Sequence, residues 1–357
     1  MKIRLIGPRN TLGVGIHFGC LVDALKQLHG LGPLVEEVNS TSQADMLAAA
    51  ARSEPTDVNI CFVSIDLQPY FRGTNIQWIV FESTRVPEIV MKTMMVSDLV
   101  WVPSDWGRQI LINNGKPADQ VDVVPEGVSA DVYHPYVPKQ SRSRMRFLSV
   151  GKYEQRKSHM ETVTAWAQVF GNDSDVELVI KTDHFVNVHA KKAAMQDFLQ
   201  QLKLTNVHVV WDAVPIDTMV NLYHSADVFV LPSKGEGWGL PIIEAAACGL
   251  PIVTTMYSGH SQYLQCITNS VLTVDYDLTH IDCPEFQYFY PTPDGDFGSW
   301  AMPRVESLSQ ALQTARNNVV ALKQQAVDNA EIIRERFSWA RCADRVAKTL
   351  QTRGLLR

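Results

Sequence analysis

The sequence lacks the marks of a membrane-spanning protein, of a disulfide scaffold and of a structural zinc protein. No apolar run approaches the ~20 residues that a membrane span needs, so only a peripheral membrane contact stays open. The 357 residues include six cysteines, none in a C-x-x-C pair or beside a histidine at zinc-finger spacing. Reduced thiols, together with an N-terminal apolar run (3–6) too short for a secretory signal, predict a cytoplasmic protein.

An excess of positive charge is also missing. Lysine and arginine number 32 against 38 aspartates and glutamates, which gives a net charge of -6. Because nucleic-acid binders are usually basic, this balance disfavours a nucleic-acid partner. The G-x-G-x-x-G fingerprint of a nicotinamide dehydrogenase is absent as well. Apolar residues nevertheless make up 46% of the chain, which indicates a folded globular protein.

Short runs of β-branched and aromatic residues recur along the chain, each bounded by polar or turn residues, as strands usually are. Apolar residues at helical spacing lie between several of these runs, first at 16–28. This alternation predicts parallel sheets with helices on both faces. The predicted strands are 3–6, 58–63, 77–81, 99–102, 121–124, 146–150, 177–180, 207–210, 228–231 and 251–254.

The pattern stops at a linker with two prolines, Pro135 and Pro138, and restarts near Arg146. A long helical region, 308–337, and a final helix, 339–350, end the chain. The sequence thus predicts one α/β domain over 1–140, a second over 145–337 and a terminal helical segment over 338–357.

The sharpest local signal is a glycine-rich loop between a predicted strand and a predicted helix, with the sequence GEGWGLPIIE at 235–244. Three glycines in five residues allow the backbone to approach a ligand closely, and Pro241 is typical of a first helical turn. A helix N-terminus binds anions, which suits a diphosphate. Glu244, placed in the first turn of the predicted helix, can accept hydrogen bonds from two vicinal hydroxyls, as on a ribose. An ordinary strand-to-helix turn fits the glycine loop equally well.

The stretch 235–253, GEGWGLPIIEAAACGLPIV, closely resembles the E-x7-E motif of retaining glycosyltransferases of family 4. This resemblance implies that the loop binds a nucleotide-sugar donor. Glu236 would position the sugar hydroxyls or stabilise positive charge on the sugar, and Glu244 would hold the ribose. The other donor-binding residues it implies are Gly237, Trp238, Gly239 and Leu240.

A second loop, SVGKYEQRKS at 149–158, carries three cations after a predicted strand. Cations there can neutralise a diphosphate leaving group, although a solvated basic loop has the same composition. The run resembles the Gly-Arg…Arg-Lys-Gly loop of the same family, with Lys152 in place of the usual arginine and Ser158 in place of the usual glycine. Either Arg156 or Lys157 would then hold the diphosphate; we favour Lys157.

Two runs in the first domain extend the resemblance. NTLGVG at 10–15 resembles the glycine doublet that the family places beside the donor, and Gly13 is the residue that carries over. Glu82 stands where many members have an acceptor-side histidine or acidic residue. Further runs that resemble family landmarks are 102–106, 124–128, 257–260 and 337–339.

The resemblance as a whole implies the GT-B fold: two Rossmann-like α/β/α domains facing a central cleft, with the C-terminal helix crossing back to the first domain. It implies a glycosyltransferase that moves a hexose-type sugar, with retention, from a UDP- or GDP-linked donor. The acceptor stays open: a saccharide, a lipid-linked saccharide, a small molecule or a protein. Asp-x-Asp pairs are absent from the candidate loops, so we expect no metal, and no cofactor. Two alternatives on the same fold are a non-hydrolysing sugar-nucleotide epimerase and a non-catalytic nucleotide-sugar binding protein.

Overall fold

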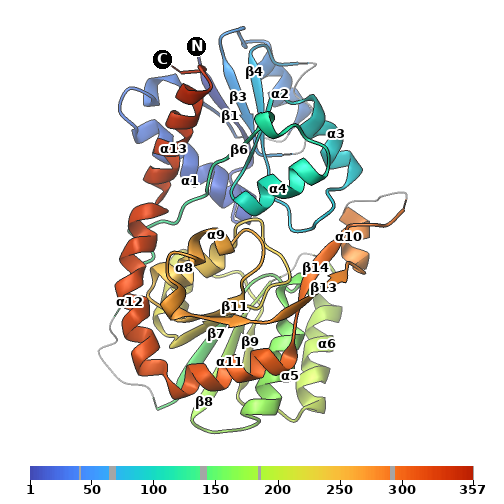
Figure 1. Cartoon of the computed structure of the whole chain (residues 1–357), viewed down its shortest axis with the longest axis vertical. Helices are drawn as coiled ribbons and strands as arrows, with labels where there is room; N and C mark the ends of the chain where they lie inside the picture. Colours follow the sequence, from blue (N-terminus) through green and yellow to red (C-terminus); the bar gives the residue numbers. More distant parts are fainter. Residues whose placement is uncertain (40–41, 64–69, 137–142, 184–185, 290–293, 357) are drawn as a thin grey trace. The chain divides into compact units, whose positions relative to one another are not determined.

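The chain folds into two compact units in the computed structural model (Figure 1). Unit 1 comprises Met1–Ser129, His280–Ser299 and Arg336–Arg357, and unit 2 comprises Ala130–Thr279 and Trp300–Glu335. Relative to the ranges expected from the sequence, the described residues 130–136 fall in unit 2 and the described residues 280–289 and 294–299 fall in unit 1. The structure describes residues 1–39, 42–63, 70–136, 143–183, 186–289 and 294–356.

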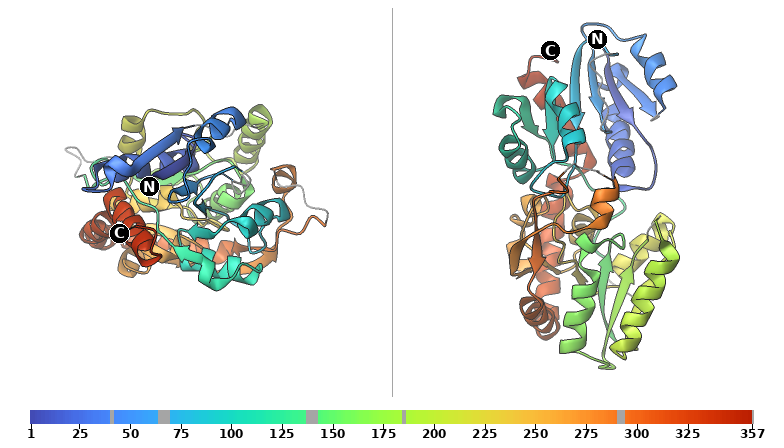
Figure 2. Two further views of the ribbon diagram at one scale, coloured as in Figure 1. Left: turned by 90° about the horizontal axis from the view of Figure 1, so that it is seen from above. Right: turned by 90° about the vertical axis from the view of Figure 1, so that its right-hand side faces the viewer.

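Unit 1 is built on a six-stranded parallel sheet with the order β2-β1-β3-β4-β5-β6. Apolar side chains form separate clusters in this unit, one around Ile6 and Phe71 and another around Val100 and Leu111, and helices lie on both sides of the sheet (Figure 2). Its strands are β1 (Ile3–Gly7), β2 (Val35–Asn39), β3 (Val58–Cys61), β4 (Thr74–Trp78), β5 (Leu99–Val102) and β6 (Val121–Val123). Its helices are α1 (Gly13–Gln27), α2 (Gln43–Ala50), α3 (Glu88–Val96), α4 (Asp105–Asn113), α10 (Pro284–Phe289) and α13 (Trp339–Thr352).

Unit 2 has its own six-stranded parallel sheet, with the order β12-β11-β10-β7-β8-β9. This is the doubly wound order, in which all strands are parallel and successive strands are added first on one side of β7 and then, from β10 on, on its other side. The strands are β7 (Met145–Val150), β8 (Val176–Lys181), β9 (Val207–Val210), β10 (Val228–Val230), β11 (Ile252–Thr255) and β12 (Val271–Val274). The helices are α5 (His159–Val169), α6 (Val188–Gln201), α7 (Ile216–His224), α8 (Leu240–Ala247), α9 (Ser261–Leu264), α11 (Val305–Asn317) and α12 (Val319–Arg336).

These sheets confirm the prediction of two Rossmann-like α/β domains, and the terminal helix α13 packs against α1 of the first unit, as predicted. The edge strands β2 and β12 were not predicted. Neither was the two-stranded sheet of β13 (Tyr276–His280) and β14 (Ser299–Pro303). The helical region expected over 308–337 is interrupted at Asn318, between α11 and α12.

Candidate functional site

The two loops singled out in the second domain begin at adjacent strands. The loop from Gly151 follows β7, and the glycine-rich loop follows β10, which pairs with β7 in parallel register. This pair is the point at which the strand order of unit 2 reverses. Ligands of open α/β sheets bind at such switch points, outside the carboxyl ends of the strands. The topology therefore brings together two loops that are far apart in the sequence.

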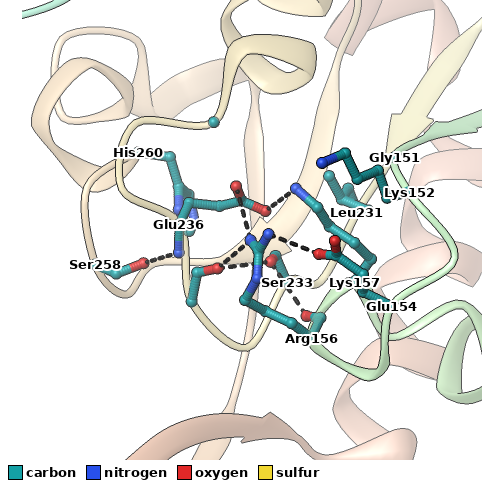
Figure 3. Close-up of polar contacts among 12 residues, drawn as sticks. Gly151, Lys152, Glu154, Arg156, Lys157, Leu231, Ser233, Glu236, Ser258 and His260 are labelled. Carbon is teal, nitrogen blue, oxygen red and sulfur yellow. Dashed lines mark hydrogen bonds and ion pairs between the residues drawn. The ribbon is translucent and has the colours of Figure 1, made fainter. Parts of the chain in front are cut away.

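Side chains from the two loops form a buried ion-pair cluster around Glu236 (Figure 3). Lys157 Nζ lies 2.7 Å from one carboxylate oxygen of Glu236, and Arg156 Nη1 lies 3.2 Å from the other. The side chains of Lys157, Arg156 and Glu236 are 8%, 9% and 5% exposed. Arg156 also donates to the Gly235 carbonyl at 2.7 Å and to the Glu154 carboxylate at 2.9 Å. Both candidate diphosphate cations are thus held in one constellation.

The charges of this cluster depend on one another. Burial alone would raise the pKa of the Glu236 carboxyl, but Lys157 and Arg156 outweigh burial and lower the pKa to about 2. Burial lowers the pKa of Lys157, and the negative charge of Glu236 opposes that shift. Burial alone would also raise the pKa of Glu154, which pairs with Arg156, but the nearby cations lower it. Two carboxylates thus balance the two cations. An anionic ligand would be bound by the N–H hydrogens of Lys157 and Arg156 that these carboxylates leave over.

The glycine-rich loop is fixed by hydrogen bonds to the loop that follows β11 (Figure 3). The backbone N–H of Glu236 donates to Ser258 Oγ at 2.8 Å, and the N–H of Gly259 donates to the Glu236 carbonyl at 2.8 Å. A Cβ on Gly259 would lie 1.9 Å from the Gly237 carbonyl oxygen, so only glycine permits this approach. Ser258 and Gly259 belong to the predicted landmark at 257–260; that they anchor Glu236 was not predicted.

Ser158 closes the cationic loop in a left-handed conformation, with φ 56° and ψ 34°. A non-glycine residue in this region costs about 1–2 kcal/mol. That strain explains why the resembling motif usually has glycine here. The stem of Lys157 packs over Gly151, where an added Cβ would lie 3.2 Å from Lys157 Cδ. The loop geometry thus directs Lys157 towards Glu236.

Helix α8 begins at Leu240, after Gly239 in the left-handed conformation at φ 89°. Tyr263 OH donates to the Gly239 carbonyl at 2.9 Å, and the ring of the buried Trp238 lies edge-on to that of Tyr263 at 4.9 Å. Gly239 is therefore the turn residue that starts the helix. Pro241 lies in the first turn, as predicted.

The prediction that Glu244 lies in this first turn was wrong. The first turn of α8 contains no acidic residue, because the helix starts at Leu240 and Glu244 is its fifth residue. Its carboxylate instead accepts a hydrogen bond from Tyr223 OH at 2.7 Å. Burial raises the pKa of Glu244 to about 7, and the hydrogen bond from Tyr223 opposes that rise.

The remaining predicted residues are distributed over both units. Lys152 directly follows Gly151 in the cationic loop. Gly13 is the first residue of α1 in unit 1. The side chain of Asn10 lies close to Gly15, where an added Cβ would be 2.1 Å from Asn10 Oδ1. Glu82, also in unit 1, is half-buried in the loop after β4.

A buried acid and a histidine lie in unit 1 and were not predicted as a pair. His17 Nδ1 is 3.7 Å from Glu126 Oε1, and both side chains are nearly inaccessible. Burial, and after it the charge of Glu82, raises the pKa of Glu126 to about 8, while burial lowers that of His17 to about 3. Both groups are thus uncharged near neutral pH. Glu126 falls in the 124–128 landmark, which was the one signal for it in the sequence.

The described residues contain neither a metal-binding cluster nor a helix suited to cross a membrane. No group of three or more histidine, cysteine, aspartate or glutamate side chains there is arranged to hold a metal ion. No helix in that part of the chain is long and apolar enough to cross a membrane. The six cysteines are free thiols.

Known proteins similar to the second domain are glycosyltransferases. Residues 138–278 match the family model of Glycosyl transferases group 1. The chain is 29% identical over 161 residues to the D-inositol 3-phosphate glycosyltransferase of Paenarthrobacter aurescens (strain TC1), covering 43% of this chain and 39% of that protein. It is 27% identical over 163 residues to the MMP alpha-(1->4)-mannosyltransferase of Mycolicibacterium hassiacum, covering 45% of this chain and 37% of that protein. The matched part is less than half the length of these relatives, and their names do not favour the epimerase alternative.

Solved structures extend the likeness to the whole chain. A sucrose-phosphate synthase from Thermosynechococcus elongatus superposes with a TM-score of 0.70 at 16% identity, covering 99% of both chains. The Anabaena protein HepE, in complex with UDP, superposes with a TM-score of 0.71 at 15% identity, covering 99% of this chain and 100% of that one. These likenesses show the fold, and the prediction of a GT-B fold is confirmed.

Proposed function

Residues 138–278 are a glycosyltransferase group 1 domain, and on this premise we propose that the chain is a retaining glycosyltransferase of family 4. It transfers a hexose-type sugar from a UDP- or GDP-linked donor to a saccharide, lipid-linked saccharide, small-molecule or protein acceptor. The observation that carries this proposal is the buried cluster of Lys157, Arg156 and Glu236 at the switch point of unit 2. A UDP complex and a UDP-glucose complex of HepE, on the same fold, support a nucleotide-sugar donor.

The cluster suits the charge that develops during transfer. The diphosphate leaves with negative charge while the sugar carbon becomes oxocarbenium-like. Lys157 donates one of its three hydrogens to Glu236, so the others can be donated to diphosphate oxygens. The N–H groups at the start of α8 add positive potential. Preorganised donors of this kind stabilise a leaving group without reorganisation.

Retention follows if the acceptor attacks from the face that the diphosphate leaves. A phosphate oxygen of the departing diphosphate then takes the acceptor proton, so no separate base is needed. Lys152 would share the diphosphate charge. Glu236 would orient the sugar or stabilise its positive charge, and Glu244 would bind the ribose hydroxyls, exchanging its hydrogen bond from Tyr223 for ribose donors.

The first test is binding of nucleoside diphosphates. A ligand that binds only the folded protein stabilises it by about 2.7 kcal/mol at a hundredfold excess over Kd. Thermal melts with UDP and GDP are therefore expected to show a raised Tm for at least one of them. The matched control is the corresponding monophosphate, which lacks the phosphate that the cluster would hold. No shift with either diphosphate, and no heat in calorimetry, would contradict the proposal.

The second test concerns metal. We expect donor turnover to survive EDTA, because lysine, arginine and helix N–H groups take the place of a divalent cation at the diphosphate. Release of nucleoside diphosphate is measured before and after chelation, with a known metal-dependent transferase treated in parallel. Turnover that disappears on chelation and returns with Mg²⁺ or Mn²⁺ would show that the cations of the loop do not suffice.

A further inference from the structure

A buried lysine lies at the same carboxyl ends of the strands of unit 2 but outside the ion-pair cluster. Lys181 is the last residue of β8 and is 4% exposed. It pairs with Val150, at the end of β7, and with Val210, at the end of β9. The N–H of Gly151 donates to the Lys181 carbonyl at 3.1 Å. Lys181 therefore lies between the start of the cationic loop and Trp211, the residue after β9.

The ammonium of Lys181 has fewer partners than a buried charge needs. Its Nζ donates one hydrogen bond, to the Thr182 carbonyl, at 3.3 Å, beyond the usual range of about 2.7–3.2 Å. No carboxylate among the described residues forms an ion pair with it. Burial lowers the pKa of Lys181, and the charges of Asp183 and Asp212 oppose that shift. The neighbouring Thr182 hydroxyl, 1% exposed, also has no hydrogen-bond partner in the described part of the chain.

The other buried lysines of the described chain show what is missing. Lys116 donates to two backbone carbonyls at 2.7 and 2.9 Å. Lys234 and Lys157 each lie 2.7 Å from a carboxylate oxygen. Buried polar groups nearly always have such partners. Lys181 is the exception, and a ligand with a hydrogen-bond acceptor would supply the partner that its ammonium lacks.

The place of Lys181 along the sheet indicates what kind of ligand this is. Its strand β8 pairs with β7, which leads into the cationic loop, on the side of β7 away from β10. Neighbouring strands are only about 5 Å apart. A nucleotide with its diphosphate at β7 and β10 therefore reaches β8 and β9 with its base.

We propose that Lys181 selects the base of the donor nucleotide, an inference that rests on the proposed function. An ammonium donates hydrogen bonds and accepts none. It fits a base with a carbonyl at position 4 of a pyrimidine or position 6 of a purine, as in uracil and guanine. It does not fit a base with an amino group at that position, as in cytosine and adenine, because two donors then face each other. The donor is thereby restricted to the UDP and GDP class.

The wild-type chain tests this without mutation. Inosine diphosphate has a carbonyl at position 6 of the base, where adenosine diphosphate has an amino group. Uridine and cytidine diphosphates differ in the same way at position 4. In calorimetry, the carbonyl member of the pair that binds is expected to be about 10- to 100-fold tighter, the range for one hydrogen bond to a charged group. Equal affinities within both pairs, or a preference for the amino member, would overturn the assignment of Lys181.

A variant then assigns the preference to this residue. Lys181→Met keeps the length and burial of the side chain and is expected to reduce the preference within each pair to under about threefold. Its affinity for inorganic pyrophosphate should stay near that of the wild type. Lys116→Met, at a buried lysine of unit 1, is the matched control and should leave the preference unchanged. If Lys181→Met does not fold, the affinities of the wild type for the two nucleotide pairs still test the proposal.

The outcomes separate the two proposals. If the wild type binds neither pyrophosphate nor any nucleoside diphosphate, the proposed function fails, and the assignment of Lys181 fails with it. If both ligand classes bind but Lys181→Met keeps the wild-type preference, the assignment alone fails and the diphosphate site stands. A loss of pyrophosphate affinity equal to the loss of base preference would instead make Lys181 a phosphate ligand.

Discussion

Replacing Lys157 by alanine is expected to lower kcat by about 100-fold or more, the scale found when a group that stabilises developing negative charge is removed. Lys157 is the cation that the structure places 2.7 Å from Glu236, with hydrogens left for the departing diphosphate. Because this charge grows as the bond breaks, kcat should fall more than KM rises. Release of nucleoside diphosphate from the donor measures both constants. Lys157→Arg should recover part of the loss, since the charge is kept but the geometry differs.

The control for this variant is another ion-paired lysine of unit 2. Lys323, on α12, lies 2.9 Å from Asp227 and is partly buried, so Lys323→Ala removes a comparable pair away from the candidate loops. It should leave kcat unchanged. A kcat for Lys157→Ala within about threefold of the wild type, under ~0.7 kcal/mol of barrier, would mean that Arg156 is the diphosphate ligand. Arg156→Ala would then show the large loss.

Glu236→Gln is expected to destabilise the protein by about 3–5 kcal/mol, because removing one partner of a buried pair leaves the opposite charge without compensation. Two cations, Lys157 and Arg156, lose that partner together. A nucleoside diphosphate supplies negative charge at the same place, so it should raise the Tm of this variant more than that of the wild type. Turnover should nevertheless fall strongly, by about 100-fold if Glu236 contacts the sugar in the transition state.

The pH dependence of this effect has a defined sign. The pKa of Glu236 is lowered from its ordinary value of 4.5 to about 2 in the folded protein. Its stabilising contribution is therefore present above about pH 4.5 and is lost as the pH falls towards 2. The difference in Tm between the wild type and Glu236→Gln should shrink over that interval. A change of equal size at every pH would contradict an ionised, paired Glu236.

The matched control for Glu236 is Glu177, whose carboxylate lies 2.7 Å from Arg146 at the start of the same sheet. Glu177→Gln should lower the Tm less, since this pair is more exposed, and should leave turnover unchanged. Nucleoside diphosphate that binds Glu236→Gln at least tenfold more weakly than it binds the wild type would show that Glu236 holds the donor directly. The cluster would then have a different purpose from charge balance.

Much of the fold could be predicted because central strands have an unambiguous pattern. β5 and β10 are buried on both faces and have the apolar sequences LVWV and VFV. Among the edge strands, β6 and β9 were predicted from their valines, but β2 was not. β2 has the sequence VEEVN and is only partly buried, so its glutamates resemble a loop. An edge strand has a single neighbour and needs less apolar surface, which lets such a strand go unrecognised.

Site residues that belong to a local sequence motif could be predicted. Contacts that form only in the folded chain could not. Lys157 and Glu236 are 79 residues apart, so their ion pair follows from the strand order and not from either motif. The error at Glu244 came from the helix start, which Gly239 sets through its left-handed conformation. Lys181 was missed because it ends an apolar strand, VELVIK, where a terminal lysine looks like an ordinary solvated residue. Its burial and its single weak hydrogen bond are properties of the folded chain.

The interleaving of the two units along the chain limits how either could be exchanged with a relative. The family match ends at residue 278, but unit 2 resumes at Trp300. Helix α11, from that second stretch, supplies Leu308 and Leu312 to the core that also contains Phe147. A hybrid protein that takes only residues 138–278 from one parent would pack the sheet of that parent against α11 of the other parent. Recombination keeps this core intact only when 130–279 and 300–335 come from the same parent, while 280–299 follows unit 1.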